Sequence, residues 1–411
     1  MILFSFILQI ALNLFAQQPN LSAGNLCGYI PQDTLVSEAP AGYKPFYISH
    51  IARHGSRFLR SGKSFNVIEE LEGYAQNGEL TEEGLALISD LKVLREMSEG
   101  HYGELTALGA EEHRQICERM MRHYPEVFSN PQRRNVETFS TNSGRVLKSR
   151  EAFLEQMKAT APNLNISKSS SGDRNSREVT GDKISEEERA EGKANAKNFD
   201  DVKKAARKGI NFKAFTEKIF TNPGAIKSSS AREIERRCQY LMSTAVTNDL
   251  KAMDPLARYF SPQELYYFWI SGSLKWAIYL NYPGYTYYVT EIIGGGILRC
   301  FIEDADEAIQ ASSGTAATLR FSHDSYLMPF IAATRAEGTV LDCDERQIPE
   351  LFQDFRYICP ACNVQFIFFR NDEGKVLVKL LINEKETLIH GLTPDTGCFY
   401  AWSRVKEFYN I

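Results

Sequence analysis

Three stretches of this chain repeat one order of local signals: an apolar run rich in β-forming residues, a polar loop, and a pattern with helical period. They begin near Phe46, Val136 and Ala317. Alternating strands and helices are typical of α/β proteins, in which functional side chains lie beyond the carboxyl ends of the strands. If the three strands are neighbours, the loops that follow them converge on one site.

The first of these loops concentrates positive charge around a histidine. It reads Arg53-His54-Gly55-Ser56-Arg57 and follows the apolar run FYISHI. Two guanidiniums four residues apart suit the oxygens of a phosphoryl group, because each donates paired hydrogen bonds and stays charged. The same positive field disfavours a protonated imidazole, which lowers the pKa of His54 and keeps the ring nucleophilic. The loop therefore predicts attack of His54 on phosphorus to give a phosphohistidine.

The other two loops supply a third cation and a proton donor. Arg145 lies where the second loop enters a helix, and His323 and Asp324 end the third strand. An alkoxide leaving group needs a proton, which Asp324 can donate under acidic conditions. A protonated His323 can hold a phosphoryl oxygen. Together the three loops predict hydrolysis of phosphate monoesters without a metal.

A polar, charge-rich stretch interrupts the α/β pattern. Residues 167–208 are predicted to form a mobile loop that runs into solvated helices, and the segments after it carry helical periodicity. Near the C-terminus, VQFIFFRNDEGKVLVKLLIN predicts a β-hairpin. We expect an α/β fold with a central mixed sheet flanked by helices. The core is assigned to residues 17–155 and 290–411, and an inserted, mainly helical cap subdomain to residues 156–289.

The N-terminus begins with an uncharged apolar run, residues 1–16, that ends in a small residue. This is typical of a secretory signal peptide with cleavage near Ala16. The alternative is a retained anchor, although the run is shorter than the about 20 apolar residues that a span needs. We expect export to the periplasm or the extracellular space, with no stable membrane insertion after cleavage. The formal net charge of −5 provides no basic field to attract nucleic acid.

Eight cysteines in an exported chain predict disulfides rather than metal ligands, and their even number fits. Cys359-Pro-Ala-Cys362 has the spacing of a redox pair and of half a zinc site, but no second ligand pair follows at zinc-finger spacing. A structural disulfide or buried thiols are the expectation there. No metal and no other cofactor is expected.

These motifs together resemble the histidine acid phosphatase branch of the histidine phosphatase superfamily, which carries an Arg-His-Gly-x-Arg loop early in the chain and a His-Asp pair late. GELTALGAEEHRQICERMMRHYPEVF resembles its Leu-Thr-x-x-Gly helix start, SGRVLKSREAF its third-arginine segment and LRFSHDS its proton-donor strand. Order and spacing agree across most of residues 43–411. ARHGSRF and the ending AWSRVKEFY look most like the multiple inositol polyphosphate phosphatase group, which usually shows His-Ala-Glu where this chain has His323-Asp324-Ser325.

The resemblance implies a role for each of six matched residues. These are His54 as nucleophile, Asp324 as general acid, Arg53, Arg57 and Arg145 as phosphate clamps, and His323 as an oxyanion ligand. Five further basic residues are candidates for a pocket that takes additional phosphates, or else for ordinary solvated charge: Arg60, Lys63, Lys168, Arg174 and Arg177.

The expected substrate is a small-molecule phosphate ester, such as an inositol phosphate (phytate) or a sugar phosphate. Two alternatives stay open: a phosphotransferase or mutase of the same superfamily, and a noncatalytic phosphate-ester binding protein.

Overall fold

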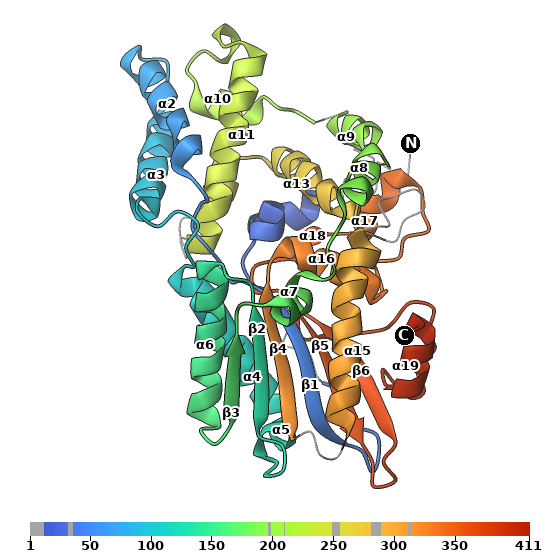
Figure 1. The fold of residues 1–411 in the computed structure, drawn as a ribbon. Coiled ribbons are helices and arrows are strands. Elements are labelled where there is room, and N and C mark those ends of the chain that lie inside the picture. The colour runs from blue at the N-terminus through green and yellow to red at the C-terminus, as the bar shows by residue number, and fades with distance from the viewer. Residues whose placement is uncertain are drawn as a thin grey trace.

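A mixed β-sheet forms the centre of the protein (Figure 1). The computed structural model describes residues 12–31, 36–195, 199–208, 210–248, 255–280, 289–310 and 314–411. The strand order is β3-β2-β4-β1-β5-β6-β7, and β8 also pairs with β6. The strands β1 to β4 run parallel, whereas β5 to β8 are joined by antiparallel pairing. The predicted α/β fold with a central mixed sheet is therefore confirmed.

The strands have these bounds: β1 Lys44–Arg53, β2 Asn135–Ser140, β3 Asn165–Ser169, β4 Thr315–Ser322, β5 Asn363–Arg370, β6 Val376–Ile382, β7 Lys385–Thr387 and β8 Tyr400–Ala401. The predicted hairpin is the antiparallel pair β5 and β6.

The middle strands are apolar because helices cover both faces of the sheet. Nearly every residue of β1 and β4 is buried. Helix α15 (Gly295–Ile309) crosses the near face in Figure 1, and α4 (Ala107–His123) lies behind the sheet beside α6 (Gly144–Thr160). The parallel register pairs Arg53 with Ser322, so the loops that leave β1 and β4 start side by side.

The start of α4 packs directly on the loop that follows β1. A Cβ on Gly109 would lie 2.2 Å from the carbonyl oxygen of Ser56, and one on Gly55 would lie 2.2 Å from the carbonyl oxygen of Gly109. Neither position accepts a side chain unless the backbone moves. Thr106 caps the helix by accepting a hydrogen bond from the Gly109 amide at 3.1 Å. The Leu-Thr-x-x-Gly sequence thus allows the backbone at the start of α4 to lie directly against the backbone of the loop that follows β1.

Helices gather beyond the carboxyl ends of the parallel strands, at the top of Figure 1, and form a cap. The cap helices are α2 Asn66–Gln76, α3 Glu82–Ser98, α8 Glu186–Asn195, α9 Asp200–Arg207, α10 Ala214–Ile219, α11 Ser228–Ala245, α12 Pro255–Tyr259 and α13 Pro262–Ala277. Two separate parts of the chain build the cap: α2 and α3 come before β2, and the other cap helices come after β3. The two parts are in contact, since α3 packs on α10 and α11. The sequence assigned α2 and α3 to the core, since their amphipathic pattern does not reveal which surface they cover.

The boundaries of the insertion also differ from the expectation. Position 156 falls inside α6, and β3 belongs to the central sheet. Helix α7 (Asp173–Thr180) packs on β2, β4 and α15. The first part of residues 167–208 therefore belongs to the core, and α8 and α9 in the rest of it belong to the cap. The composition misled because β3 is a short, mostly exposed edge strand and the charges of α7 have buried partners.

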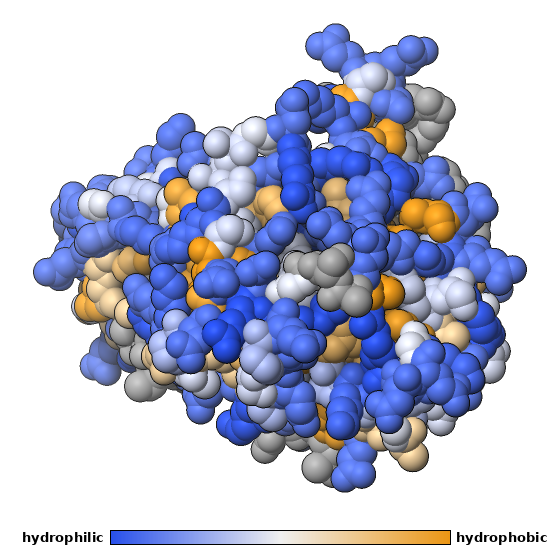
Figure 2. Space-filling model, turned by 60° about the horizontal axis from the view of Figure 1, so that its bottom comes forward, coloured by the Kyte–Doolittle hydropathy of each residue, from blue (hydrophilic) through white to orange (hydrophobic). Residues whose placement is uncertain are grey.

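The remaining short helices are α5 Pro125–Ser129, α16 Asp324–Ala333, α17 Ile348–Leu351, α18 Asp354–Tyr357 and α19 Trp402–Tyr409. Among the described residues, each helix is too short or too polar to cross a membrane. The face shown in Figure 2 is mainly hydrophilic, with apolar residues scattered over it. Such scattered apolar residues are normal for a protein surface.

The N-terminal segment packs against the cap. Residues 1–11 of the predicted signal peptide lie outside the described residues. Phe15, by contrast, is 1% exposed and its ring lies 5.3 Å from that of Trp269. A 3₁₀ segment, η1 (Pro19–Leu26), follows and packs on α13 and α18.

The expectation of disulfides is wrong for this structure, because all eight described cysteines are thiols. Six of them are buried. Buried cysteine behaves as a small apolar side chain, which explains how such residues fit a core without pairing.

Candidate active site

The carboxyl ends of β1 and β4 place the predicted residues in one cluster. The amide of His54 donates to the carbonyl oxygen of Ser322 at 3.0 Å, which ties the end of β1 to the end of β4. The ring centroids of His54 and His323 lie 5.5 Å apart. Arg145 joins from the first turn of α6, with its Nη2 at 3.4 Å from Nδ1 of His323. The cluster therefore joins three strand ends, as the sequence predicted.

His54 is held as a neutral imidazole with one nitrogen available. The ring is 3% exposed, and Nδ1 lies 2.8 Å from the carbonyl oxygen of Gly55. A carbonyl only accepts, so Nδ1 carries the proton and Nε2 keeps its lone pair. Burial, reinforced by the Arg53 guanidinium, holds the pKa of His54 well below its ordinary value. The geometry thus leaves the lone pair of Nε2 available on a neutral ring.

Among the arginines of this cluster, Arg53 is the most deeply buried. Its side chain is 0% exposed, and Nη1 donates to the carbonyl oxygens of Asn25 and Ile358, both at 2.6 Å. Its Nη2 lies 3.0 Å from Oδ2 of Asp324. The Nε atoms of Arg53 and Arg145 are buried and have no acceptor among the described residues. An anion is the partner that these donors lack.

The arginines also repel one another. Burial and the nearby Arg53 lower the pKa of Arg57 to about 10, and burial together with Arg60 lowers that of Arg145. The hydroxyl of Thr247, from the turn that follows α11, donates to the carbonyl oxygen of Arg57 at 3.1 Å. The cluster thus lies between the sheet and the cap, and an anion that binds there relieves the repulsion.

His323 is also neutral in the unliganded protein. A guanidinium only donates, so Nδ1 accepts from Arg145 and Nε2 carries the proton that faces the Thr141 hydroxyl at 3.1 Å. Burial and Arg145 lower the pKa of His323 to about 4. The sequence treated His323 as a cation, but the neutral ring can still donate its Nε2 proton to a phosphoryl oxygen.

Asp324 begins α16 and is a carboxylate. Although burial raises its pKa, the Arg53 and Arg57 guanidiniums outweigh burial and hold the value below the usual one. Oδ2 forms the ion pair with Arg53 and accepts from Nδ2 of Asn25 at 3.1 Å, while Oδ1 accepts from the Ser325 amide at 2.9 Å. The carboxyl is thus held on both oxygens next to the arginine cluster.

Two polar residues that sequence reasoning missed support this cluster. Glu112 in α4 is buried and accepts from the amide and the hydroxyl of Ser56, each at 2.7 Å. Asn25 lies on the N-terminal segment. Neither residue stands in a local pattern that indicates its role, although the helix-start motif near Glu112 pointed to the right element.

The five basic residues predicted to line a pocket separate into two groups. Arg60 and Lys63 are exposed and follow the first loop closely in sequence. Arg60 is near enough to Arg145 for its positive charge to lower the pKa of Arg145. Lys168 instead forms an ion pair with Glu151.

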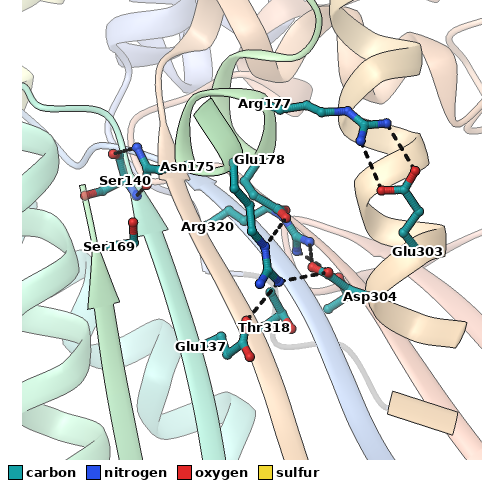
Figure 3. A network of polar contacts seen from close by, with 12 residues as sticks. Glu137, Ser140, Ser169, Asn175, Arg177, Glu178, Glu303, Asp304, Thr318 and Arg320 are labelled. Carbon is teal, nitrogen blue, oxygen red and sulfur yellow. Dashed lines mark hydrogen bonds and ion pairs between the residues drawn. The ribbon is translucent and has the colours of Figure 1, made fainter. Parts of the chain in front are cut away.

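Arg174 and Arg177 are neutralised by acidic partners. Arg174 pairs with Glu137 at 3.0 Å. Arg177 pairs with Glu303 at 3.1 Å (Figure 3). The pocket role is therefore not supported for Lys168, Arg174 or Arg177, because nearby carboxylates already use their charge.

A buried ion network fixes the end of β4 (Figure 3). Arg320, 0% exposed, donates to Glu178 of α7 at 2.7 Å and also pairs with Asp304 of α15. The hydroxyl of Ser322 donates to the carbonyl oxygen of Val179 at 2.6 Å. Helix α7 is thus tied to the strand residue that precedes His323.

The same helix fixes the end of β2. The side-chain amide of Asn175 pairs with the backbone of Ser140 in both directions, at 3.0 and 2.9 Å (Figure 3). Ser140 immediately precedes Thr141, which faces His323. The α7 segment therefore positions two neighbouring loops of the site.

Comparison with known proteins identifies the family. The model of the histidine phosphatase superfamily (branch 2) matches residues 48–383, and the chain belongs to this family. No curated protein sequence matches the chain.

Solved structures share the fold at low identity. The multiple inositol polyphosphate phosphatase of Bifidobacterium longum, in complex with phosphate, has a TM-score of 0.75 at 17% identity, over 94% of this chain and 97% of that one. The phytase from D. castellii has a TM-score of 0.67 at 16% identity, over 95% and 84%. The Hafnia alvei phytase, in its apo form, has a TM-score of 0.53 at 10% identity, over 91% and 98%.

The buried ion network of Arg320 should contribute to the free energy of unfolding. Arg320→Met removes the buried cation between Glu178 and Asp304 and leaves them only the longer ion pairs with the exposed Arg174, at 3.6 and 3.4 Å. The free energy of unfolding should therefore fall by up to about 3–5 kcal/mol near neutral pH. Without Arg320, the two buried carboxylates bind protons more tightly in the folded state than in the unfolded one. The loss should therefore shrink on acidification to about pH 5. Urea unfolding at both pH values measures it.

Arg236→Met is the matched control, because Arg236 pairs with Glu233 on the exposed face of α11. Its effect should stay within about 0.5 kcal/mol. Equal losses in the two variants would contradict the role given to the buried network.

Proposed function

We propose that this protein hydrolyses small-molecule phosphate monoesters through a phosphohistidine on His54. One observation carries the proposal: a buried, neutral histidine offers Nε2 at the centre of three arginines, two of which hold buried donors without an acceptor in the described chain. Family membership and the fold of the phytase neighbours agree with it.

In the first step, Nε2 of His54 attacks phosphorus and the bond from phosphorus to the ester oxygen breaks. The leaving alcohol takes its proton from Asp324. Arg53, Arg57 and Arg145 bind the phosphoryl oxygens, and their fixed charge stabilises the transition state. His323 donates its Nε2 proton to one of these oxygens.

In the second step, water attacks the phosphohistidine and Asp324 accepts a proton from that water. Phosphate leaves, and His54 returns to the neutral state. The pKa of Asp324 is low in the unliganded protein because of Arg53 and Arg57. A bound phosphate dianion offsets those charges, which raises the pKa of Asp324 and loads the acid for the first step.

The proposed substrate class is inositol phosphates, with phytate as the first candidate. The structural neighbours include phytases and a multiple inositol polyphosphate phosphatase solved with inositol hexasulfate. In this chain, exposed Arg60 and Lys63 follow the catalytic loop and supply positive charge for phosphates other than the one that reacts. The cap helices lie beyond the strand ends that carry the site (Figure 1).

The proposed location is outside the cytoplasm, because of the apolar residues 1–16 and their small final residue. Cleavage after Ala16 would also remove Phe15 from its contact with Trp269. Mass spectrometry of the protein purified from its host measures this directly: loss of the first 16 residues is expected, and an intact Met1 would refute cleavage.

The nucleophile is tested by His54→Ala, assayed for phosphate release with EDTA present on phytate, a sugar phosphate and p-nitrophenyl phosphate. We expect a loss of about 10³-fold or more on each ester. Because burial and Arg53 lower the pKa of His54, wild-type kcat/KM should persist on acidification well below about pH 6.5, where an ordinary histidine titrates.

His123→Ala is the control, since His123 lies at the far end of α4, and its rate should match the wild type. A full rate in His54→Ala would refute the mechanism. Tight phosphate binding without turnover in the wild type would favour the noncatalytic binding protein instead.

The proposed pocket is tested by comparing Arg60→Ala with Arg174→Ala. Arg60 is exposed next to the arginine cluster, whereas Arg174 is paired with Glu137. Arg60→Ala should raise KM for phytate about 3- to 10-fold, with less effect on p-nitrophenyl phosphate and a smaller difference at high salt. Arg174→Ala should leave both KM values unchanged. An equal effect of the two variants on phytate would contradict this assignment.

A further inference from the structure

The N-terminal segment places an amide against the proposed general acid. Asn25 lies at the end of η1, about 300 residues before Asp324 in sequence. Its Nδ2 donates to Oδ2 of Asp324 at 3.1 Å, and its backbone carbonyl accepts from Arg53 at 2.6 Å. One residue therefore contacts both the acid and the buried cation.

A tight turn fixes the backbone of Asn25. Gly24 has φ 57 and ψ −125, which is a conformation that favours glycine. A Cβ at this position would lie 2.6 Å from Oδ2 of Asp354. The close approach lets the backbone amide of Asn25 donate a hydrogen bond to the same Oδ2 of Asp354 at 3.1 Å.

Asp354 is in turn anchored in the cap. It is 2% exposed, and its Oδ1 accepts from Nε1 of Trp269 at 3.0 Å. A buried carboxylate with donors on both oxygens does not reorient readily. The side chain of Asn25 is thus presented to Asp324 from a rigid support.

We propose that Asn25 is a positioning residue that holds the Asp324 carboxyl for proton transfer to the leaving group. The inference rests on the proposed phosphatase function. When substrate phosphate recruits Arg53, the ion pair that holds Oδ2 of Asp324 weakens. The side-chain amide of Asn25 is neutral, so phosphate attracts it less strongly than it attracts Arg53. The amide therefore keeps its hydrogen bond to Oδ2 of Asp324.

The test uses the dependence of the rate on the leaving group. Glycerol 2-phosphate needs a proton donor to expel its alkoxide, whereas p-nitrophenyl phosphate releases a stable anion without one. Asn25→Leu keeps the backbone contacts and removes the donor. It should lower kcat/KM on glycerol 2-phosphate about tenfold or more, with a much smaller loss on p-nitrophenyl phosphate. The ratio kcat/KM is compared because it reports formation of the phosphohistidine and leaves out the water attack that both esters share. Asn25→Asp, which also removes the amide donor, should show the same selectivity.

Ser22→Ala is the matched control within the same segment. Its hydroxyl donates to the carbonyl oxygen of Pro19 at 2.6 Å and does not touch the site. The variant should leave the ratio of the two rates unchanged. A loss of equal size on both esters in Asn25→Leu, reproduced by Ser22→Ala, would overturn the inference, because it would show only a loosened segment.

A second readout does not depend on turnover. Carbon-13 NMR titration of the aspartate carboxyls should show a higher pKa for Asp324 in Asn25→Leu than in the wild type, since a donor to the charged form is lost. Arg53, Arg57 and His323 also face this carboxyl and are unchanged in the variant. An unchanged titration would count against the contact. A wild type without turnover on any ester would instead refute the proposed function.

Discussion

The site depends on the burial of one cation, the guanidinium of Arg53. A buried charge is costly unless its donors are paired, and here the pairing comes from distant parts of the chain. The carbonyl oxygens of Asn25 and Ile358 and the carboxylate of Asp324 all converge on it. Because one strand end requires all three partners, the N-terminal segment, the β4 loop and the segment before β5 are each fixed relative to His54. The Nε of Arg53 remains buried without an acceptor among the described residues, and an anion can supply one.

The central part of this arrangement is legible in the sequence. Apolar runs that end in charged residues mark strand ends, and parallel pairing brings such ends together, so the positions of His54, Arg145 and His323 could be inferred. The supporting residues could not. Glu112 and Asn25 are ordinary polar residues in their local context, and only contacts with residues far along the chain give them a role.

Charge was the least informative signal. Arg60 and Arg174 look alike in sequence, yet one is exposed near the arginine cluster and the other is bound by Glu137. A charge-rich stretch was taken for a mobile loop, although part of it, α7, carries Glu178 into a buried network with Arg320. The cap shows the same limit, because an amphipathic helix reveals that it covers something apolar but not which surface it covers.

The placement of Asn25 and Ile358 has a consequence for the timing of biosynthesis. A ribosome makes Asn25 and His54 early, but Asp324 and Ile358 emerge only when most of the chain is complete. Until then Arg53 has none of the later partners that bury it, and the cluster around His54 cannot assemble. A growing or extended chain of this protein therefore lacks the assembled cluster of Arg53, His54 and Asp324.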